Sequence, residues 1–147
     1  MSVRRLSANA PCRCDSGRKA KGCCLPALAG TSALTPEALM RSRYTAYAVG
    51  NIAYVMRTTD PAGPKANPDA QTWAAEVRQF SENVSFDGLE VRAASASGDT
   101  GEVTFFATLA HAGTDVSFGE RSRFVRRDGQ WLYVDGDRLA LPPKVNP

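Results

Sequence analysis

The sequence has only one histidine, His111, and it lacks the common motifs of nucleotide-binding proteins and hydrolases. Neither G-x-x-x-x-G-K-[ST] nor G-x-G-x-x-G occurs, and there is no G-x-S-x-G nucleophile elbow. No H-x-x-x-H pattern or acid-rich cluster accompanies His111, so we expect it at a solvated hairpin position. We therefore assign no catalytic residue, and the sequence does not favour an enzyme.

Long apolar runs are also missing. No stretch approaches the roughly 18 residues that would indicate a membrane-spanning helix. The opening "MSVRRLSANAPC" has two arginines but no apolar stretch after them, so it does not read as a signal peptide. With 147 residues, 43% of them hydrophobic and 22% charged, the chain is predicted to be one globular domain with a small appendage, located in the cytoplasm.

Cysteine is confined to one segment, "CRCDSGRKAKGCC", which spans residues 12–24 and holds all four cysteines of the chain. The neighbours Cys23 and Cys24 have Cα atoms about 3.8 Å apart, below the roughly 4.4 to 6.8 Å of most disulfides. Cross-pairs between the two ends are geometrically feasible, but a reducing compartment would keep them open. There is no C-x-x-C redox pair, and a catalytic cysteine would need a base nearby. Four converging thiolates instead favour a tetrahedral metal site formed by Cys12, Cys14, Cys23 and Cys24. Zinc is the preferred ion, and iron would also accept four sulfurs.

The cysteine segment is basic, whereas the rest of the chain is slightly acidic. Residues 1–30 carry six Lys and Arg residues against one acid, and residues 31–147 have a net charge of −2. The patch that we single out consists of Arg13, Arg18, Lys19 and Lys21. It could bind an acidic protein surface or nucleic acid. Alternatively, it solvates the segment and balances a metal–thiolate centre whose net charge would be −2.

The stretch "PCRCDSGRKAKGCC" resembles the SEC-C motif, a short zinc module close to P-C-P-C-G-S-G-x-x-x-x-x-C-C. The residues that match are Pro11, Cys12, Cys14, Ser16, Gly17, Cys23 and Cys24. Arg13, Asp15 and Ala20 replace a usual proline, glycine and aromatic residue, but the ligands are intact. The resemblance implies zinc binding and a protein partner, with translation or export machinery as the natural place to look.

Two further stretches narrow the resemblance. "TPEALMRSRYTAYAVGN" and, much later, "ERSRFVRRDGQWLYVDG" resemble the YchJ family of small bacterial proteins. In that family a SEC-C motif precedes a domain similar to nuclear transport factor two. The resemblance implies a metal knuckle over residues 1–30 and a cone-shaped domain over residues 31–147.

The residue pattern agrees with an α+β domain. Thr35 is a candidate N-cap with Pro36 at the first helical position, and Gly50 ends that helix. A second helix is predicted from Asn51 to about Thr59, and a third from Asp69 to about Glu82. The period then changes to two, which predicts four strands, at 84–94, 101–111, 116–126 and 130–136. Three helices on one face of a curved four-stranded antiparallel sheet are therefore expected.

Alternation along the last two predicted strands places Glu120 on an aromatic-rich face, and Trp131, Tyr133 and Asp135 together on another. With Arg43 and Tyr47 of the first helix, these residues could line a pocket in which burial makes Glu120 a general base. The alternative is a buried Arg43–Glu120 ion pair that ties the helix to the sheet.

Two functions follow. The first is an adaptor that recognises another macromolecule through the basic, metal-bound knuckle, with the cone as a rigid body or dimer interface. The second is a small-molecule binder or enzyme that uses a cone pocket lined by Arg43, Tyr47 and Glu120. The missing catalytic set favours the adaptor.

Overall fold

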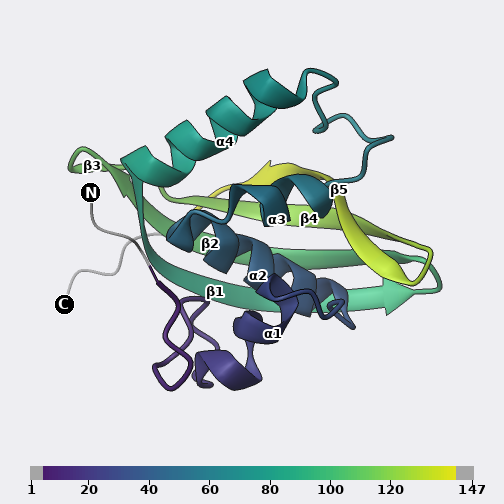
Figure 1. Cartoon of the computed structure of the whole chain (residues 1–147), viewed down its shortest axis with the longest axis horizontal. Helices are drawn as coiled ribbons and strands as arrows, with labels where there is room; N and C mark the ends of the chain where they lie inside the picture. The colour runs from purple at the N-terminus through teal and green to yellow at the C-terminus, as the bar shows by residue number, and fades with distance from the viewer. Residues whose placement is uncertain (1–4, 142–147) are drawn as a thin grey trace.

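The computed structural model describes residues 5–141 and contains one curved antiparallel sheet with helices on one face (Figure 1). The strands follow the order β1-β2-β4-β5, and a short β3 pairs with β2. Their bounds are β1 Val84–Ser97, β2 Thr100–His111, β3 Thr114–Asp115, β4 Phe118–Arg127 and β5 Gln130–Leu139. This architecture confirms the predicted α+β class.

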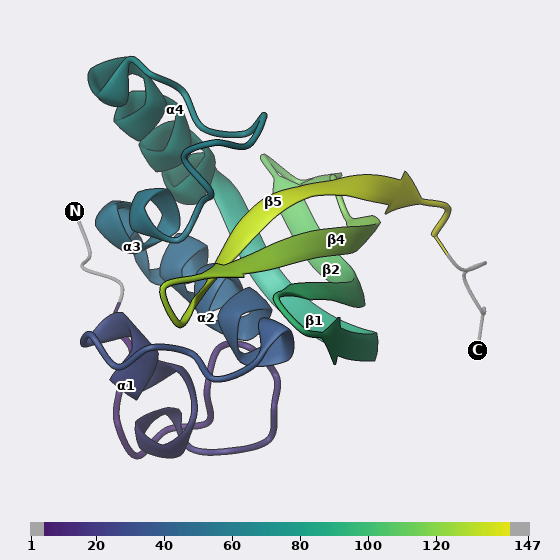
Figure 2. The same ribbon diagram turned by 90° about the vertical axis from the view of Figure 1, so that its right-hand side faces the viewer.

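Three helices cover the sheet, and each begins at a side-chain cap. In α2 (Pro36–Val49) the Thr35 hydroxyl accepts from Ala38 N at 3.0 Å, and Gly50 ends the helix at φ 81°. Asn51 caps α3 (Ile52–Arg57), and Asp69 caps α4 (Ala70–Asn83). Figure 2 shows all three helices on the same side of the sheet, with α2 in the hollow. The bounds differ from the predicted ones by one or two residues.

The sheet is irregular where it bends. The β1–β2 hairpin pairs Val84 with His111 at one end and Ser97 with Thr100 at the other, with register shifts beside Gly88 and before Ala93. Such irregularities increase the local twist. The sheet curves around α2, and Leu39, Phe86 and Val103 belong to one continuous core between the two layers. The curvature positions the site, because it leaves a hollow between the sheet and the helices.

The strand prediction missed β3 and therefore began the next strand too early. Residues 114–115 fold back and pair with Ala110 and His111 of β2, so β4 begins at Phe118 instead of residue 116. β1 also runs to Ser97, three residues beyond the predicted end. His111 ends β2 and is exposed.

The cysteine segment packs against the cone as a compact loop with two short helices, η1 (Ala20–Gly22) and α1 (Cys24–Leu28). Helix α1 packs against α2. The segment also contacts the sheet, because the Asp15 carboxylate accepts a hydrogen bond from Leu89 N of β1 at 3.1 Å. No helix in the described part of the chain is long and apolar enough to cross a membrane.

Candidate metal centre and neighbouring cavity

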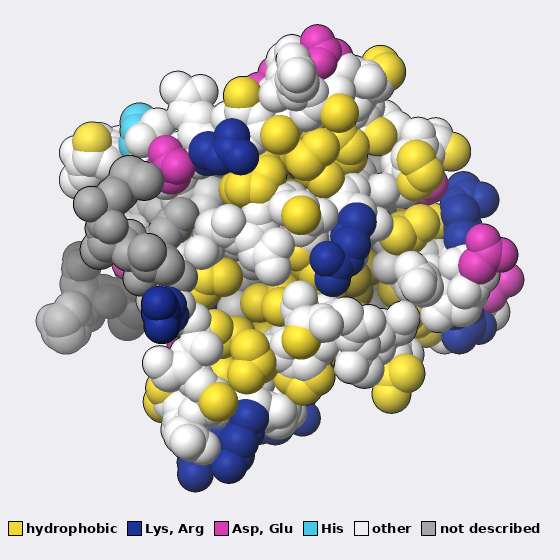
Figure 3. Space-filling view, in the orientation of Figure 1, with side chains coloured by type: hydrophobic (Ala, Val, Ile, Leu, Met, Phe, Trp, Pro, Cys, Tyr) yellow, Lys and Arg dark blue, Asp and Glu magenta, His cyan; other side chains and the backbone are white. Residues whose placement is uncertain are grey.

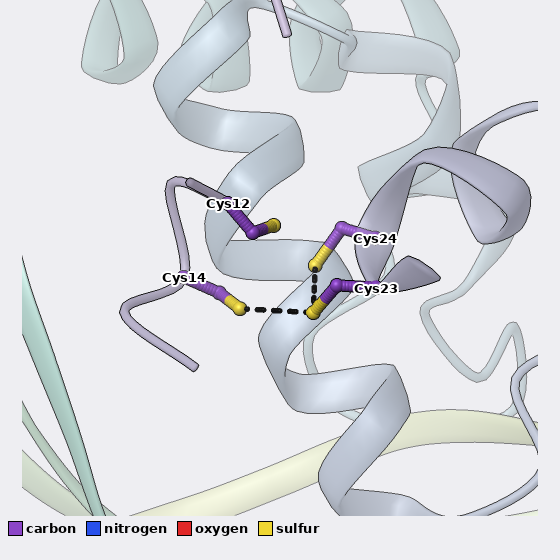
Figure 4. Close-up of side chains that lie close together, drawn as sticks. All are labelled: Cys12, Cys14, Cys23 and Cys24. Atoms are coloured by element: carbon purple, nitrogen blue, oxygen red, sulfur yellow. Dashed lines mark hydrogen bonds between the residues drawn. The ribbon is translucent and has the colours of Figure 1, made fainter. Parts of the chain in front are cut away.

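The four cysteine sulfurs converge on one point (Figure 4). Their Sγ atoms all lie within 4.8 Å of one another, with 3.4 Å between Cys14 and Cys23 and 3.9 Å between Cys23 and Cys24. All four are free thiols. Sulfurs about 2.3 Å from a tetrahedral zinc ion stand about 3.8 Å apart, so the donor set fits such an ion. The four cysteines could therefore hold a metal.

Backbone geometry explains why two short clusters meet. Asp15 and Gly17 both adopt positive φ, at 61° and 82°, which reverses the chain after Cys14. Pro11 and Lys19 then form an isolated antiparallel bridge, and Cys12 N donates to Arg18 O at 2.8 Å. The reversal returns the chain beside its start, and η1 delivers Cys23 and Cys24 to the first pair.

Helix α2 supplies polar contacts to the sulfurs. The buried Thr45 hydroxyl donates to Cys24 Sγ at 3.3 Å and lies 3.9 Å from Cys12 Sγ. Arg41 Nη1 donates to the Cys14 carbonyl at 2.8 Å and lies 3.9 Å from Cys14 Sγ. Donors of this kind stabilise thiolates and orient metal ligands. The centre is therefore completed by the cone.

The crowded thiols also influence one another's ionisation. Hydrogen bonds from the Cys14 and Cys24 thiols hold the pKa of Cys12 below its ordinary value. The same interactions, chiefly with Cys12 and then Cys14, together with burial raise the pKa of Cys24. Four thiolates in one place would need a cation to offset their charge, and a metal ion held by the four sulfurs would supply it.

The basic patch lies on the outer side of this centre. Arg13, Arg18, Lys19 and Lys21 are all exposed, and Lys and Arg side chains gather at the lower end of the molecule in Figure 3, where this segment lies. Arg18 also approaches Cys23 Sγ at 3.7 Å, and Ser16 Oγ lies 3.1 Å from the same sulfur. Arg18 thus links the patch to the cysteine cluster beneath it.

A cavity of about 360 Å³ lies on the other side of α2, between the helices and the sheet. Arg41 and Thr45 face the cysteines, whereas Arg43 and Tyr47, two residues farther along the helix in each case, line the cavity. Nearly half of its lining residues are aromatic, and hydrophobic side chains also gather around α3 and α4 on the face shown in Figure 3. The volume lies in the usual range of small-molecule sites.

Arg43 and Glu120 both line the cavity, but they do not form the predicted ion pair. Arg43 Nη1 donates to Val55 O, Thr58 Oγ1 and Thr59 Oγ1 at 2.9, 2.8 and 3.1 Å. Its guanidinium also lies over the Tyr133 ring, 4.7 Å from the centroid. Burial lowers the pKa of Arg43 from its ordinary value. The side chain therefore ties α2 to the end of α3, and that contact was not predicted.

Glu120 has partners of its own on the sheet. Its Oε2 accepts from Ser122 Oγ at 2.7 Å and from Tyr133 OH at 2.9 Å, and its Oε1 lies 3.6 Å from Arg138 Nε. Burial and the Glu120 charge raise the pKa of Tyr133, so this phenol remains a donor at neutral pH. A Cβ at Gly136 would overlap the Glu120 carboxylate, so only glycine leaves room for it.

The structure places Asp135 outside the cavity and Trp131 in the core. Arg123 pairs with Asp135 but Phe124 pairs with Tyr133, so Val134 is an extra residue that reverses the alternation. The Asp135 carboxylate points to the outer face and accepts from Arg123 Nε at 2.6 Å. The prediction that Asp135 shares the face of Tyr133 is therefore wrong. Trp131 is 4% exposed and packs in the main core.

Comparison with known proteins identifies the family. Residues 35–136 match the model of the YchJ middle NTF2-like domain. The chain belongs to the YchJ family. The UPF0225 protein of Deinococcus radiodurans is 42% identical over 127 residues, which cover 85% of this chain and 87% of that protein. A UPF0225 protein of Geobacter sulfurreducens is 35% identical over 139 residues, with 92% and 83% coverage.

Two solved structures of SEC-C motif containing proteins are similar to this chain. A SEC-C motif containing protein from Rhodopseudomonas palustris is 36% identical, with a TM-score of 0.76 over 89% of this chain and all of that one. A SEC-C motif containing protein from Psychrobacter arcticus shares the fold, with a TM-score of 0.72 at 22% identity over 94% of this chain and 86% of that one. The predicted YchJ and SEC-C relationship is confirmed.

Arg41 and Thr45 are the contacts to the cysteines that sequence reasoning missed. Both belong to "TPEALMRSRYTAYAVGN", the stretch that carries the YchJ resemblance. Their spacing of four residues places them on one helical face, which was the available signal. Nothing in the spacing indicated that the face would meet the cysteines.

Proposed function

We propose that the protein binds one zinc ion per chain through Cys12, Cys14, Cys23 and Cys24, and that this ion holds a basic recognition surface on the cone. The observation that carries the proposal is the convergence of four reduced sulfurs within 4.8 Å. All-thiolate donor sets of this kind suit zinc in closed structural sites. The proposal includes a cytoplasmic location, where such thiols stay reduced.

Elemental mass spectrometry on protein purified without added metal tests the zinc assignment. We expect about one zinc per chain, with thiols that react only after a chelator is added. Iron in place of zinc would change the ion but keep the site. Metal-free protein with oxidised cysteines would contradict the proposal.

The recognition surface consists of Arg13, Arg18, Lys19 and Lys21, and we propose that its partner is an acidic protein surface. Support comes from the exposure of all four side chains on a loop that the metal centre and Arg41 hold in place. A fixed patch of one sign steers and selects a complementary partner. In this function the cone provides the rigid body, as a monomer or a dimer, and translation or export machinery is the first place to search.

Cross-linking with mass spectrometry compares the metal-loaded protein with a charge-reversed variant, R13E/K19E/K21E, which leaves the Arg18–Cys23 contact intact. We expect ribosomal or translocase proteins to be cross-linked by the wild type and lost in the variant. A second charge reversal on the sheet, R121E, serves as the matched control. Partners that persist in the triple variant would contradict this surface, and partners lost after nuclease treatment would indicate nucleic acid instead.

A second candidate function is the binding of a small organic molecule in the cavity. It is favoured by the open volume beside Arg43, where a direct Arg43–Glu120 pair would have filled the space. The test is ligand-observed NMR with a library of small aromatic molecules, using Ala107→Leu to fill the cavity. Ligands whose binding is unchanged by Ala107→Leu would contradict binding in this cavity. No catalytic role is assigned to Glu120, because its carboxylate is already held by Ser122 and Tyr133.

A further inference from the structure

Arg43 is a buried cation that the protein neutralises only in part. Its residue is 9% exposed, and all three of its hydrogen-bond acceptors are uncharged oxygens on α3 and the two residues that follow it. No carboxylate oxygen in residues 5–141 lies within 4.0 Å of its guanidinium. Buried charges normally have a paired counter-ion, so this one lacks its usual partner.

The three hydrogen bonds all come from Nη1, which leaves the opposite edge of the guanidinium unused. Nε and Nη2 together present two parallel N–H groups, and neither has an acceptor within the described chain. This edge is the one that binds a carboxylate through two parallel hydrogen bonds. The side chain cannot turn it away easily, because Nη1 is anchored and Tyr133 stacks below.

Glu120 attracts the Arg43 guanidinium only from a longer distance and forms no salt bridge with it. Its Oε2 is held by Ser122 and Tyr133, and its Oε1 is nearest to Arg138 at 3.6 Å. The overlap that any Cβ at Gly136 would cause shows how closely the sheet encloses this carboxylate. Among the described lining residues, three are cationic (Arg43, Lys65 and Arg138) and only Glu120 is anionic. The cavity therefore favours an anionic guest.

The apolar lining residues of the cavity determine which kind of molecular scaffold the anionic ligand can have. The lining includes Phe86, Phe105 and Phe118 from three neighbouring strands and Tyr47, Trp73 and Phe80 from the helices, and the rings of Tyr47, Phe80 and Phe86 contact one another. Such walls bind flat apolar groups by burial and by edge-to-face contact. A volume of about 360 Å³ is at the lower end of small-molecule sites and suits a compact molecule.

We propose that the cavity binds small aromatic carboxylic acids, with the carboxylate accepting from Nε and Nη2 of Arg43 and the ring lying among the aromatic walls. This assignment rests on the second candidate function, because it names the ligand class of the same cavity. It requires no metal and no chemical step. The metal centre on the other side of α2 is a separate site.

Calorimetric titration with three molecules of similar body tests the proposal: 1-naphthylacetate, 1-naphthylacetamide and 1-naphthyl phosphate. We expect the wild type to bind the carboxylate at least about tenfold more tightly than the uncharged amide and more tightly than the phosphate. Arg43→Lys keeps the charge but removes the two-pronged edge, so it should remove that preference. Glu120→Gln should retain or increase carboxylate affinity, and Ala107→Leu should weaken all three ligands.

An NMR measurement on the wild type keeps the test valid if Arg43→Lys does not fold. The Arg43 Nε–H resonance should shift when 1-naphthylacetate is added and remain in place with the amide. Equal affinity for acid and amide, lowered together by Ala107→Leu, would overturn the carboxylate class while leaving the cavity as a binding site. Tighter binding of the phosphate would also overturn it. No binding of any of the three at millimolar concentration would overturn both.

Discussion

Thr45 is the residue that most directly joins the cone to the metal centre. Its hydroxyl is fully buried and donates to Cys24 Sγ at 3.3 Å, so it stabilises a thiolate that burial alone would disfavour. We expect Thr45→Val to keep the fold but weaken metal affinity by about tenfold. Competition with a colorimetric chelator measures the change. Thr108→Val, an exposed substitution on β2, is the control, and equal affinities in the two variants would contradict the role of the hydroxyl.

Gly136 and Glu120 lie in contact, and their contributions to the free energy of unfolding can be measured separately. We expect Gly136→Ala to destabilise the protein by about 1 to 3 kcal/mol, because the new methyl displaces the Glu120 carboxylate from Ser122 and Tyr133. In a Glu120→Ala background the same substitution should cost much less. Urea unfolding of the four proteins in this double-mutant cycle gives the coupling energy. Additive costs would show that the overlap is relieved without moving Glu120.

At the scale of elements, the segment between α3 and α4 is attached by one nearly buried carboxylate. Asp60 is 3% exposed, and Arg127 of β4 donates to both of its oxygens at 3.3 and 3.1 Å. Asp60 N also donates to Tyr133 O of β5 at 2.8 Å. The hydrogen bonds from Arg127 hold the pKa of Asp60 below its ordinary value. The charged form therefore stabilises the fold.

This lowered pKa predicts a specific pH dependence. The stabilisation is present above the unfolded-state pKa, about 3.9, and is lost as the pH falls through the lower folded-state value. We expect Asp60→Asn to cost about 1 to 2 kcal/mol at neutral pH and progressively less below about pH 4. Urea unfolding of wild type and variant at matched pH values measures the difference. Asp128→Asn, in an exposed turn, should show no such trend, and a cost that is constant with pH would contradict the assignment.

Which elements could be predicted from sequence depends on how local their determinants are. Thr35, Asn51, Asp69 and Gly50 act within a few residues, so helix bounds were predicted to within one or two residues. The β4–β5 irregularity at Val134 has no comparable local signal, since it arises from pairing with β4. The strict alternation assumed for β5 therefore placed Asp135 on the wrong face.

The candidate sites divide in the same way. The convergence of the four cysteines was predictable because four cysteines within thirteen residues already restrict the chemistry. The partner of Arg43 was not, because Thr58 and Thr59 reach it through the packing of α3 on α2. An Arg43–Glu120 ion pair was the simplest expectation, but Arg43 binds threonines at the end of α3 and Glu120 binds side chains on the sheet. Local chemistry could be predicted, and tertiary contacts could not.

At the scale of the whole molecule, the cysteine cluster and the cone share one core. Cys12, Cys14 and Cys24 pack in the same cluster as Leu39 and Met40 of α2. We expect the double variant C23S/C24S to lose amide protection in residues 10–28 and to melt cooperatively at a temperature several degrees lower. Hydrogen exchange and calorimetry measure the two effects. An unchanged melting temperature would show that the segment contributes nothing to the cone, and loss of all folded structure would show that the cone cannot stand without the metal.

The short sequence range of the metal centre's contacts has a consequence for synthesis on the ribosome. Its ligands and its two α2 contacts, Arg41 and Thr45, all lie within residues 12–45, so they emerge before any strand of the sheet. Domains assemble from the N-terminal side as the chain is made. The cysteine segment and the first long helix can therefore pack together early, and the hydrogen bond from Leu89 N to Asp15 forms only once β1 has been synthesised. If the proposed zinc ion binds at this stage, its supply during translation would determine whether β1 packs against a folded cysteine segment.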